Sequence, residues 1–295
     1  MTGALLKRLR NPVPQLLAGV FVLLWSTGFI GARLGLPHAE PFTFLSLRFA
    51  LLTLILGGYS LLVRAPWPRE PRQILQVAVS GLLMHSLYLG GVFYAISVGM
   101  PAAIAAMIVG TQPLLTAALA GPLLGERVTP RQWLGFVLGL VGVMLVVGPN
   151  MGAETGGVAA LAAATGALLG ITLGTIYQKR YGAKMDLRSG ATIQFALCTL
   201  TMALLAVSCE NLTVDWNGEF LFALLWLVLV LSIGAVSLLY LMIRRGLASR
   251  VASLFYLVPP VTAIIAWLVF DEHLGLPAIC GMIVAACGVA LVVRK

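Results

Sequence analysis

The sequence predicts an all-α polytopic membrane protein, and three observations carry that prediction: its composition, ten long apolar runs, and a sequence that repeats itself once. Of 295 residues, 60% are hydrophobic and only 10% are charged, whereas soluble domains carry about a quarter charged residues. The mean hydropathy is +1.01. A chain this apolar needs a lipid environment, and ten spans of about 20 residues leave no room for a separate soluble domain.

Ten apolar runs are each long enough, or nearly so, to cross a bilayer as a helix. They are continuously apolar rather than alternating, which favours helices over the strands of a barrel. The first run continues through Ile30 and nine more follow it, so we interpret it as a retained helix rather than a cleaved signal sequence. The predicted spans are Leu16–Gly31, Phe42–Val63, Ile74–Val98, Ala102–Leu124, Trp133–Val147, Val158–Tyr177, Ala191–Val207, Phe220–Ile243, Val251–Phe270 and Leu276–Val293.

The basic residues predict how these spans are oriented. With ten spans, 17 of the 19 Lys and Arg residues fall on one side, which the positive-inside rule assigns to the cytoplasm together with both termini. Because these residues lie singly or in small groups in short loops, the net charge of +9 indicates membrane orientation rather than a nucleic-acid partner. The opposite side collects the acids Glu40, Glu154, Glu210, Asp215, Glu219, Asp271 and Glu272.

The sequence repeats at an offset of 146 residues with almost no gaps. Residues 1–148 and 149–295 are therefore predicted to be two five-helix repeats. Because five is odd, the second copy enters the membrane from the opposite side, which gives the inverted topology of many secondary transporters. The alternative is that duplication only enlarged a stable bundle. The matching pairs include Phe49–Leu54 with Phe195–Leu200, Tyr94 with Tyr240, Pro113 with Pro259, and Glu126 with Glu272.

Prolines interrupt the fourth and ninth predicted spans at matching places in the repeats. Pro113 cannot donate to the Val109 carbonyl, and neither Pro259 nor Pro260 can donate one turn back. Free carbonyls at mid-membrane depth need water, a side chain or a ligand. We interpret these kinks as lining a cavity; the alternative is a packing kink whose carbonyls are satisfied by nearby side chains such as Thr262.

Few polar residues lie inside the spans, and those few are the candidates for a binding cavity. No Asp or Glu lies within the first eight spans, so no proton carrier is evident. His85 shares a helix face with Met84 and Tyr88, and an ionisable group inside a membrane is a functional suspect. An aromatic, uncharged cavity would suit a neutral or zwitterionic, partly apolar solute. Its expected lining residues are Trp25, Met84, His85, Tyr88, Met107, Thr111 and Tyr256.

Arg48 is the other ionisable residue within a predicted span. It lies about 9 Å into the second span at 1.5 Å per residue, close enough to the surface for its side chain to snorkel outward. Two roles are open to it: structural pairing, or contact with a substrate carboxylate.

Small residues predict which helices meet. Gly135 and Gly139 form a GxxxG pattern in the fifth span, and Gly281 and Ala285 hold the equivalent positions in the tenth. We expect these repeat partners to pack together around a pseudo-twofold axis within a monomer; a homodimer face is the competing use.

No motif indicates covalent chemistry, a metal or a cofactor. The four cysteines have no CxxC spacing, and the sequence contains no HExxH, no intramembrane Asp pair and no GxSxG. We therefore expect a protein that is not an enzyme and holds no cofactor.

Several local patterns are shared with a known family. In each repeat a proline precedes a glutamate by thirteen positions, the first span holds Leu24-Trp25, and the second holds Arg48-Phe49. In these patterns the chain resembles the EamA-type branch of the drug/metabolite transporter superfamily, over nearly its whole length. The resemblance implies ten helices in two inverted five-helix repeats, and export of amino acids or other metabolites from bacteria.

Within that branch, Trp25-Ser26-Thr27, His85 and Tyr88 are similar to the YddG-type aromatic amino-acid exporters. The region around Trp25 lacks the glutamate that the first helix carries in the superfamily's small four-helix multidrug transporters. The resemblance thus implies inner-membrane export of aromatic and other neutral amino acids by alternating access. The alternatives are a multidrug or nucleoside-like metabolite exporter and a passive channel, the last distinguished by a flux that neither saturates nor shows counterflow.

Overall fold

The computed structural model describes residues 13–124, 129–147, 156–181, 186–244 and 254–293. Within these ranges the chain is helical, and its only β interaction is an isolated bridge between Ala39 and Val214. The prediction of an all-α protein is confirmed for this part of the chain. Glu126, Glu154 and the side chain of Tyr256 lie outside what the structure describes.

Within the described residues the two halves contain closely matching helices, except that the counterpart of residues 102–110 falls mostly outside them. The first half comprises α2 (Val13–Gly35), α3 (Pro41–Leu62), α4 (Pro71–Gly81), the π-helical η1 (Leu82–Leu87), α5 (Tyr88–Ser97), α6 (Ala102–Gly110), α7 (Gln112–Leu124) and α8 (Pro130–Val147). The second comprises α9 (Gly157–Tyr181), α10 (Leu187–Cys209), α11 (Gly218–Leu225), the π-helical η4 (Trp226–Ala235), α12 (Val236–Arg244), the short 3-10 helix η5 (Phe255–Leu257), α14 (Val258–Phe270) and α15 (Leu276–Val293).

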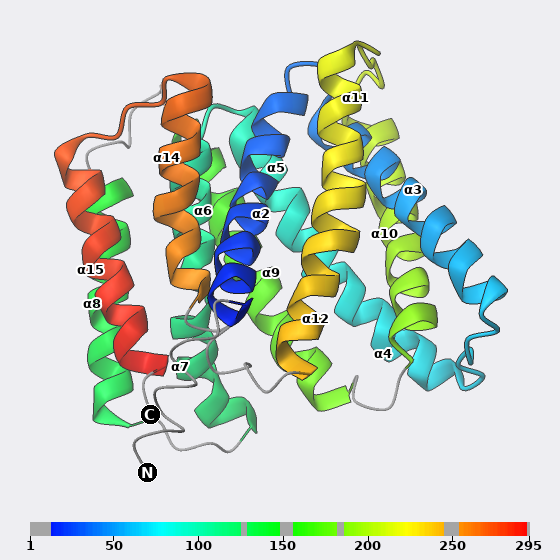
Figure 1. The fold of residues 1–295 in the computed structure, drawn as a ribbon, viewed down its shortest axis with the longest axis horizontal. Helices are drawn as coiled ribbons and strands as arrows, with labels where there is room; N and C mark the ends of the chain where they lie inside the picture. Colours follow the sequence, from blue (N-terminus) through cyan, green and yellow to red (C-terminus); the bar gives the residue numbers. More distant parts are fainter. Residues whose placement is uncertain (1–12, 125–128, 148–155, 182–185, 245–253, 294–295) are drawn as a thin grey trace.

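The bounds of these helices reproduce the sequence repeat. Shifting α7 and α8 by 146 residues gives the limits of α14 and α15, and the shifted η1 falls inside η4. Even the π-helical turns, which are rare in proteins, recur at the equivalent place. The helix α2 begins and α15 ends at the same end of the bundle (Figure 1).

Six helical segments are long and apolar enough to cross a bilayer, so the chain is a multi-span membrane protein. Four further apolar helices are shorter. That the chain crosses the membrane ten times stays a prediction. The long segments are Leu16–Gly35, Pro41–Leu62, Pro71–Ser97, Gly157–Tyr181, Leu187–Cys209 and Gly218–Leu239; the shorter ones are Ala102–Thr116, Pro130–Leu145, Val258–Phe270 and Leu276–Leu291.

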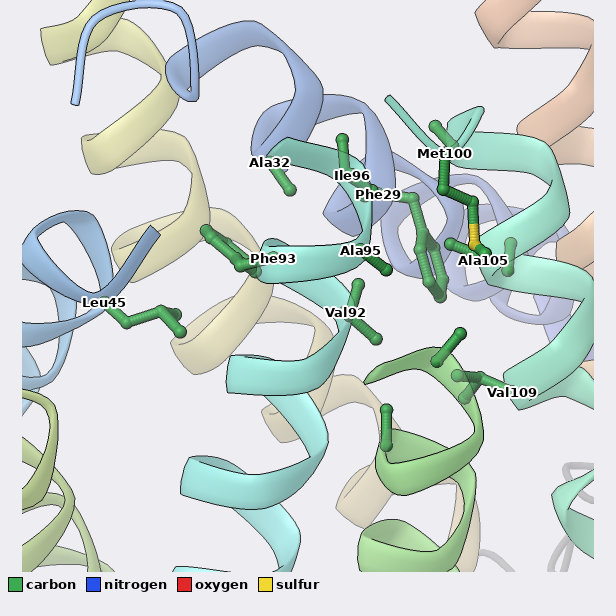
Figure 2. Close-up of a cluster of buried hydrophobic side chains, with 14 of the residues drawn as sticks. Phe29, Ala32, Leu45, Val92, Phe93, Ala95, Ile96, Met100, Ala105 and Val109 are labelled. Carbon is green, nitrogen blue, oxygen red and sulfur yellow. The ribbon is translucent and has the colours of Figure 1, made fainter. Parts of the chain in front are cut away.

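A core of small and aromatic residues holds the bundle together. In α6, every residue from Ala102 to Val109 is buried, because four alanines allow neighbouring helices to approach closely. Side chains from α2, α3 and α5, among them Phe29, Leu45 and Phe93, lie in the same cluster (Figure 2). The same core includes residues of α9, α10 and α11, and α14 packs against α6, so the core joins helices of both repeats.

The helices α8 and α15 pack through glycines, as the small-residue pattern predicts. A Cβ added at Gly142 would lie 2.6 Å from both the Ala285 nitrogen and the Gly281 oxygen. A Cβ added at the equivalent Gly288 would lie 2.5 Å from the Gly135 oxygen. The contact is reciprocal, which is the signature of a twofold relation between two copies of one surface.

Candidate functional site

The helices α3 and α10 are also repeat partners, and they meet at the same pseudo-twofold axis. Phe49 and Phe195, which are 146 residues apart, place their ring centroids 5.8 Å apart. One turn further, the hydroxyl oxygens of Thr53 and Thr199 are 3.4 Å apart. In each pair a residue faces its own counterpart in the other repeat, so the pseudo-twofold axis runs between the two helices at this point.

His85 lies against this aromatic pair. Its ring stacks on Phe195 with centroids 4.6 Å apart and an interplanar angle of 29°, and its centroid is 6.3 Å from that of Phe49. The Gln194 side chain lies within hydrogen-bonding reach of the imidazole. His85 belongs to the π-helical η1, and π-helical turns are frequent at functional sites. His85 and the nearby Tyr88 are only partly buried, although they face the interior helices.

Arg48 is buried in the bundle rather than snorkelling to its surface, so that part of the sequence-based expectation is wrong. The residue is 3% exposed. Its Nη2 donates to the Ser232 hydroxyl at 3.0 Å, and that hydroxyl donates in turn to the Leu227 carbonyl at 2.9 Å. Ser232 lies in η4, within the span Gly218–Leu239. Because the Arg48 side chain extends to this hydroxyl, its guanidinium lies deeper in the bundle than the position of Arg48 along α3 suggests.

The regular α-helix of the fourth and ninth predicted spans is interrupted close to their prolines. The first break falls at Thr111, between α6 and α7, and Pro113 is the second residue of α7. Pro259 and Pro260 lie in the first turn of α14, where a helix leaves its N–H groups unpaired and proline is well tolerated. The prolines therefore open new helices. A Cβ added at Gly110 would lie 2.8 Å from Cγ of Pro259, so the two breaks touch.

Hydroxyl groups satisfy carbonyls beside these breaks. The Thr111 hydroxyl donates to the Ile108 carbonyl at 2.6 Å. The buried Ser26 hydroxyl donates to Val22 at 2.8 Å and lies 3.3 Å from the Val258 carbonyl, at the start of α14. None of these carbonyls lies four residues before a proline, so the cavity and packing interpretations of the kinks both stay predictions.

The structure gives the expected lining residues several different neighbours, and their grouping around one cavity stays a prediction. Trp25 lies with Phe21 and Phe255, at centroid distances of 5.3 and 5.1 Å, and Trp25 and Phe255 also pack against the large core of the bundle. Met107 is 2% exposed and belongs to the core. Met84 packs against Gly174, on the face of η1 that meets α9.

Charged groups tie the two repeats together at one end of the bundle, uppermost in Figure 1. We name this end, defined by Glu40, Glu210, Asp215, Glu219 and Glu272, the acidic end. The Glu210 carboxylate accepts hydrogen bonds from the backbone N–H groups of Phe42 and Thr43 and from the Thr43 hydroxyl, each at 2.7 Å. It therefore caps α3 from the opposite repeat.

Two further contacts cross between the repeats at the acidic end. Arg33 Nε lies 3.6 Å from Glu272 Oε1. Burial raises the pKa of Glu272 above its ordinary value, against the opposing effects of Arg33 and of the backbone at Ala102 and Ala103. His38 Nδ1 lies 3.2 Å from Asp215 Oδ2.

The fold, the doubled helix pattern and the interior polar groups define a class of membrane transporter. The model of the EamA-like transporter family matches residues 14–148 and 158–294, once per repeat, and the chain belongs to this family. The family assignment made from the sequence is confirmed. The YddG-type assignment within it stays a prediction.

Individual relatives are similar at low identity over almost their whole length. An uncharacterized transporter, YvbV of Bacillus subtilis, is 25% identical over 98% of this chain and 94% of its own. A probable amino-acid metabolite efflux pump of Salmonella typhimurium is 24% identical over 92% of each chain. A protein crystal structure with 19% identity superposes with a TM-score of 0.66 and covers 95% of this chain and 97% of its own, which supports the fold alone.

Sequence reasoning missed several residues that the structure places in the interior or at the acidic end. Ser232, Gln194 and Phe195 come from the second repeat, and Glu210 lies between two spans. The repeat itself held a signal: Gln194 is the counterpart of Arg48, and Ser232 that of Ser86. Applying the offset to each polar candidate would have drawn attention to both.

Proposed function

We propose that the protein exports aromatic and other neutral amino acids across the bacterial inner membrane by alternating access. The observation that carries the proposal is the stack of His85 on Phe195 beside Phe49 at the pseudo-twofold axis. The stack combines side chains of both repeats, midway along their helices. A solute bound beside it would contact both halves of the protein, so relative motion of the halves would change its exposure.

The chemistry of this stack favours a planar, apolar group in the substrate. Aromatic rings bind other rings in offset or edge-to-face arrangements worth about 0.5 to 1.5 kcal/mol beyond the area that they bury. Tyr88 and His85 add polar atoms to the same region. The Salmonella relative, named a probable amino-acid metabolite efflux pump, supports the same substrate class.

The proposal includes ten crossings, with the two repeats inverted. The reciprocal contacts of Gly142 and Gly288 support the twofold relation, and such a relation gives two conformations open to opposite sides. In this proposal the acidic end faces away from the cytoplasm, because the basic loops lie at the other end.

Cysteine accessibility tests the orientation. Cys209, Cys280 and Cys287 are exposed and would be replaced by serine, while the buried Cys198 stays. In that background, Asp215→Cys in intact cells should react with a membrane-impermeant maleimide, and Arg69→Cys should react only after the cells are opened. The reverse pattern would contradict the orientation.

Transport by purified protein in sealed liposomes tests the function. We expect phenylalanine and tryptophan to show saturable flux and counterflow, with leucine slower and nucleosides or cationic dyes not moved. Preferential movement of a nucleoside or dye would instead favour the metabolite or multidrug alternative. A flux that neither saturates nor shows counterflow would indicate a channel and exclude alternating access.

A further inference from the structure

Arg48 has no acidic partner among the described residues. The structure places no carboxylate of these residues within 4 Å of its guanidinium, and the side chain to which the guanidinium donates is the neutral Ser232 hydroxyl. Its Nε is fully buried and donates no hydrogen bond. A cation that is 97% removed from solvent thus retains an unused donor.

Such a group is costly for a membrane protein to keep. Burying a charge without a counter-charge costs several kcal/mol, far more than one hydroxyl contact returns. Arginine within a span normally pairs with an acid or lines a pathway for a solute. A ligand of opposite charge would remove the cost.

The second repeat shows that packing alone does not need this charge. Gln194 holds the position equivalent to Arg48, and its Cβ and Cγ would lie 2.8 and 2.9 Å from a Cβ added at Gly81. A neutral side chain therefore satisfies the same place in the same helix scaffold. The charge is the feature that distinguishes the first repeat from the second here.

We propose that the Arg48 guanidinium binds the carboxylate of the transported solute. This inference rests on the proposed function and names the part of the substrate that the site recognises. The Nε–H group is free to donate to a carboxylate oxygen, and guanidinium groups match carboxylates geometrically. Ser232 acts as a positioning residue, because its hydroxyl accepts from Nη2 and directs the side chain toward the middle of the bundle.

The neighbours of Arg48 complete a recognition site for an aromatic amino acid. Phe49, which follows Arg48 in α3, places its ring centroid 6.3 Å from that of His85. A carboxylate at Arg48 would leave the rest of the solute beside the His85–Phe195 stack. The site combines an anion contact with an aromatic surface, which is the pattern needed for a zwitterion with an apolar side chain.

The first test compares phenylalanine with phenylalaninamide, which lacks the carboxylate, in liposomes. We expect Arg48→Gln, which copies the residue of the second repeat, to raise the KM for phenylalanine about tenfold or more and to leave transport of the amide unchanged. Arg48→Lys should lose less, because it keeps the charge without the planar fork. A wild-type KM in Arg48→Gln, or an equal loss for both solutes, would overturn the inference.

The second test measures binding without transport, so that it separates this inference from the proposed function. In detergent and chloride-free buffer, 3-phenylpropionate should raise the unfolding temperature of the wild-type protein but not of Arg48→Gln, whereas 3-phenylpropanamide should act equally weakly on both. That result without any amino-acid flux would retain the carboxylate site and reject amino-acid export. Stabilisation by chloride alone, or no carboxylate effect in the wild type, would overturn the site.

If Arg48→Gln fails to fold, Arg48→Lys is used in the same comparison. Its stabilisation by 3-phenylpropionate should be weaker than that of the wild type. A stabilisation equal to that of the wild type would overturn the site.

Discussion

The α8–α15 and α3–α10 pairs lie on one pseudo-twofold axis but use their duplicated residues differently. In α8–α15 the contacts are reciprocal: Gly142 approaches Gly281 and Ala285, and Gly288 approaches Gly135. In α3–α10 the phenylalanine on the axis occurs in both repeats, but the residue before it differs between them. The closest backbone contacts of α8–α15 keep glycine in both copies, at positions 142 and 288, whereas this polar position diverged.

Two of the differences between the repeats lie beside the axis. Arg48 in the first repeat corresponds to Gln194 in the second, and His85 corresponds to Leu231. A symmetric scaffold can move between two related conformations, but a substrate without twofold symmetry cannot bind equally to both copies. The asymmetric residues are therefore the natural place for recognition.

The N-termini of α3 and α10 are also capped differently. Glu210 caps α3 from the other repeat, whereas Asp186 caps α10 from its own chain segment, accepting from the Arg188 backbone N–H at 2.9 Å. A cap from the opposite repeat links the two halves. At the start of α10 the link between the halves is instead the Ser189 hydroxyl, which donates to the Pro66 carbonyl at 2.6 Å.

The largest expected effect lies in the symmetric pair. Gly142→Ala and Gly288→Ala should each destabilise the protein by about 3 kcal/mol, because the new methyl group meets backbone atoms that cannot rotate away. Unfolding in detergent, followed by circular dichroism, measures this. Gly166→Ala is the matched control, since nothing lies within 4 Å of a Cβ there. Markedly unequal losses at positions 142 and 288 would show that the contact is not reciprocal.

The cap of α3 should contribute more than a local cap. Glu210→Ala removes three hydrogen bonds between the repeats and should cost about 2 kcal/mol, read from the same unfolding measurement. Glu70→Ala provides the control, because Glu70 precedes α4 but makes no capping hydrogen bond with its side chain. If Glu210→Ala lowered the free energy of unfolding no more than Glu70→Ala does, Glu210 would not stabilise α3 by capping it from the opposite repeat.

His85 and Leu231 test the asymmetry beside the axis. His85→Ala should raise the KM for phenylalanine about threefold to tenfold, since a ring contact is worth about 1 kcal/mol, and should leave the protein folded. Leu231→Ala at the equivalent position should lower stability with little change in KM. Equal changes in KM would mean that both repeats bind the solute alike.

The smallest expected effect concerns the local cap of α10. The Arg188 side chain holds the pKa of Asp186 down at about 2, from an ordinary value of 3.8. Because the folded state favours the ionised carboxyl, its stabilising effect is complete above the ordinary pKa and is lost as the pH falls from there toward 2. Asp186→Ala should cost about 1 kcal/mol at pH 7 and flatten this part of the stability profile. An unchanged acid profile would show that Asp186 does not cap α10 in solution.

The amino-acid sequence by itself determined that the protein lies in lipid, that it is helical and that its sequence is repeated once. Composition requires a lipid environment, continuous apolar runs predict helices, and the 146-residue offset reproduces the bounds of α7, α8, α14 and α15. It also predicts that the glycine-lined helices meet. These features are readable because each is a periodic or copied pattern along one chain.

Only the tertiary structure decided which polar groups face one another. Arg48 was placed near the surface by its distance along α3, yet its guanidinium reaches Ser232 of the other repeat. The ring partners of Trp25 and His85, Phe255 and Phe195, were likewise not foreseen. The physical reason is that a side chain's partner depends on its rotamer and on the packing angle between helices distant in sequence, neither of which leaves a periodic trace.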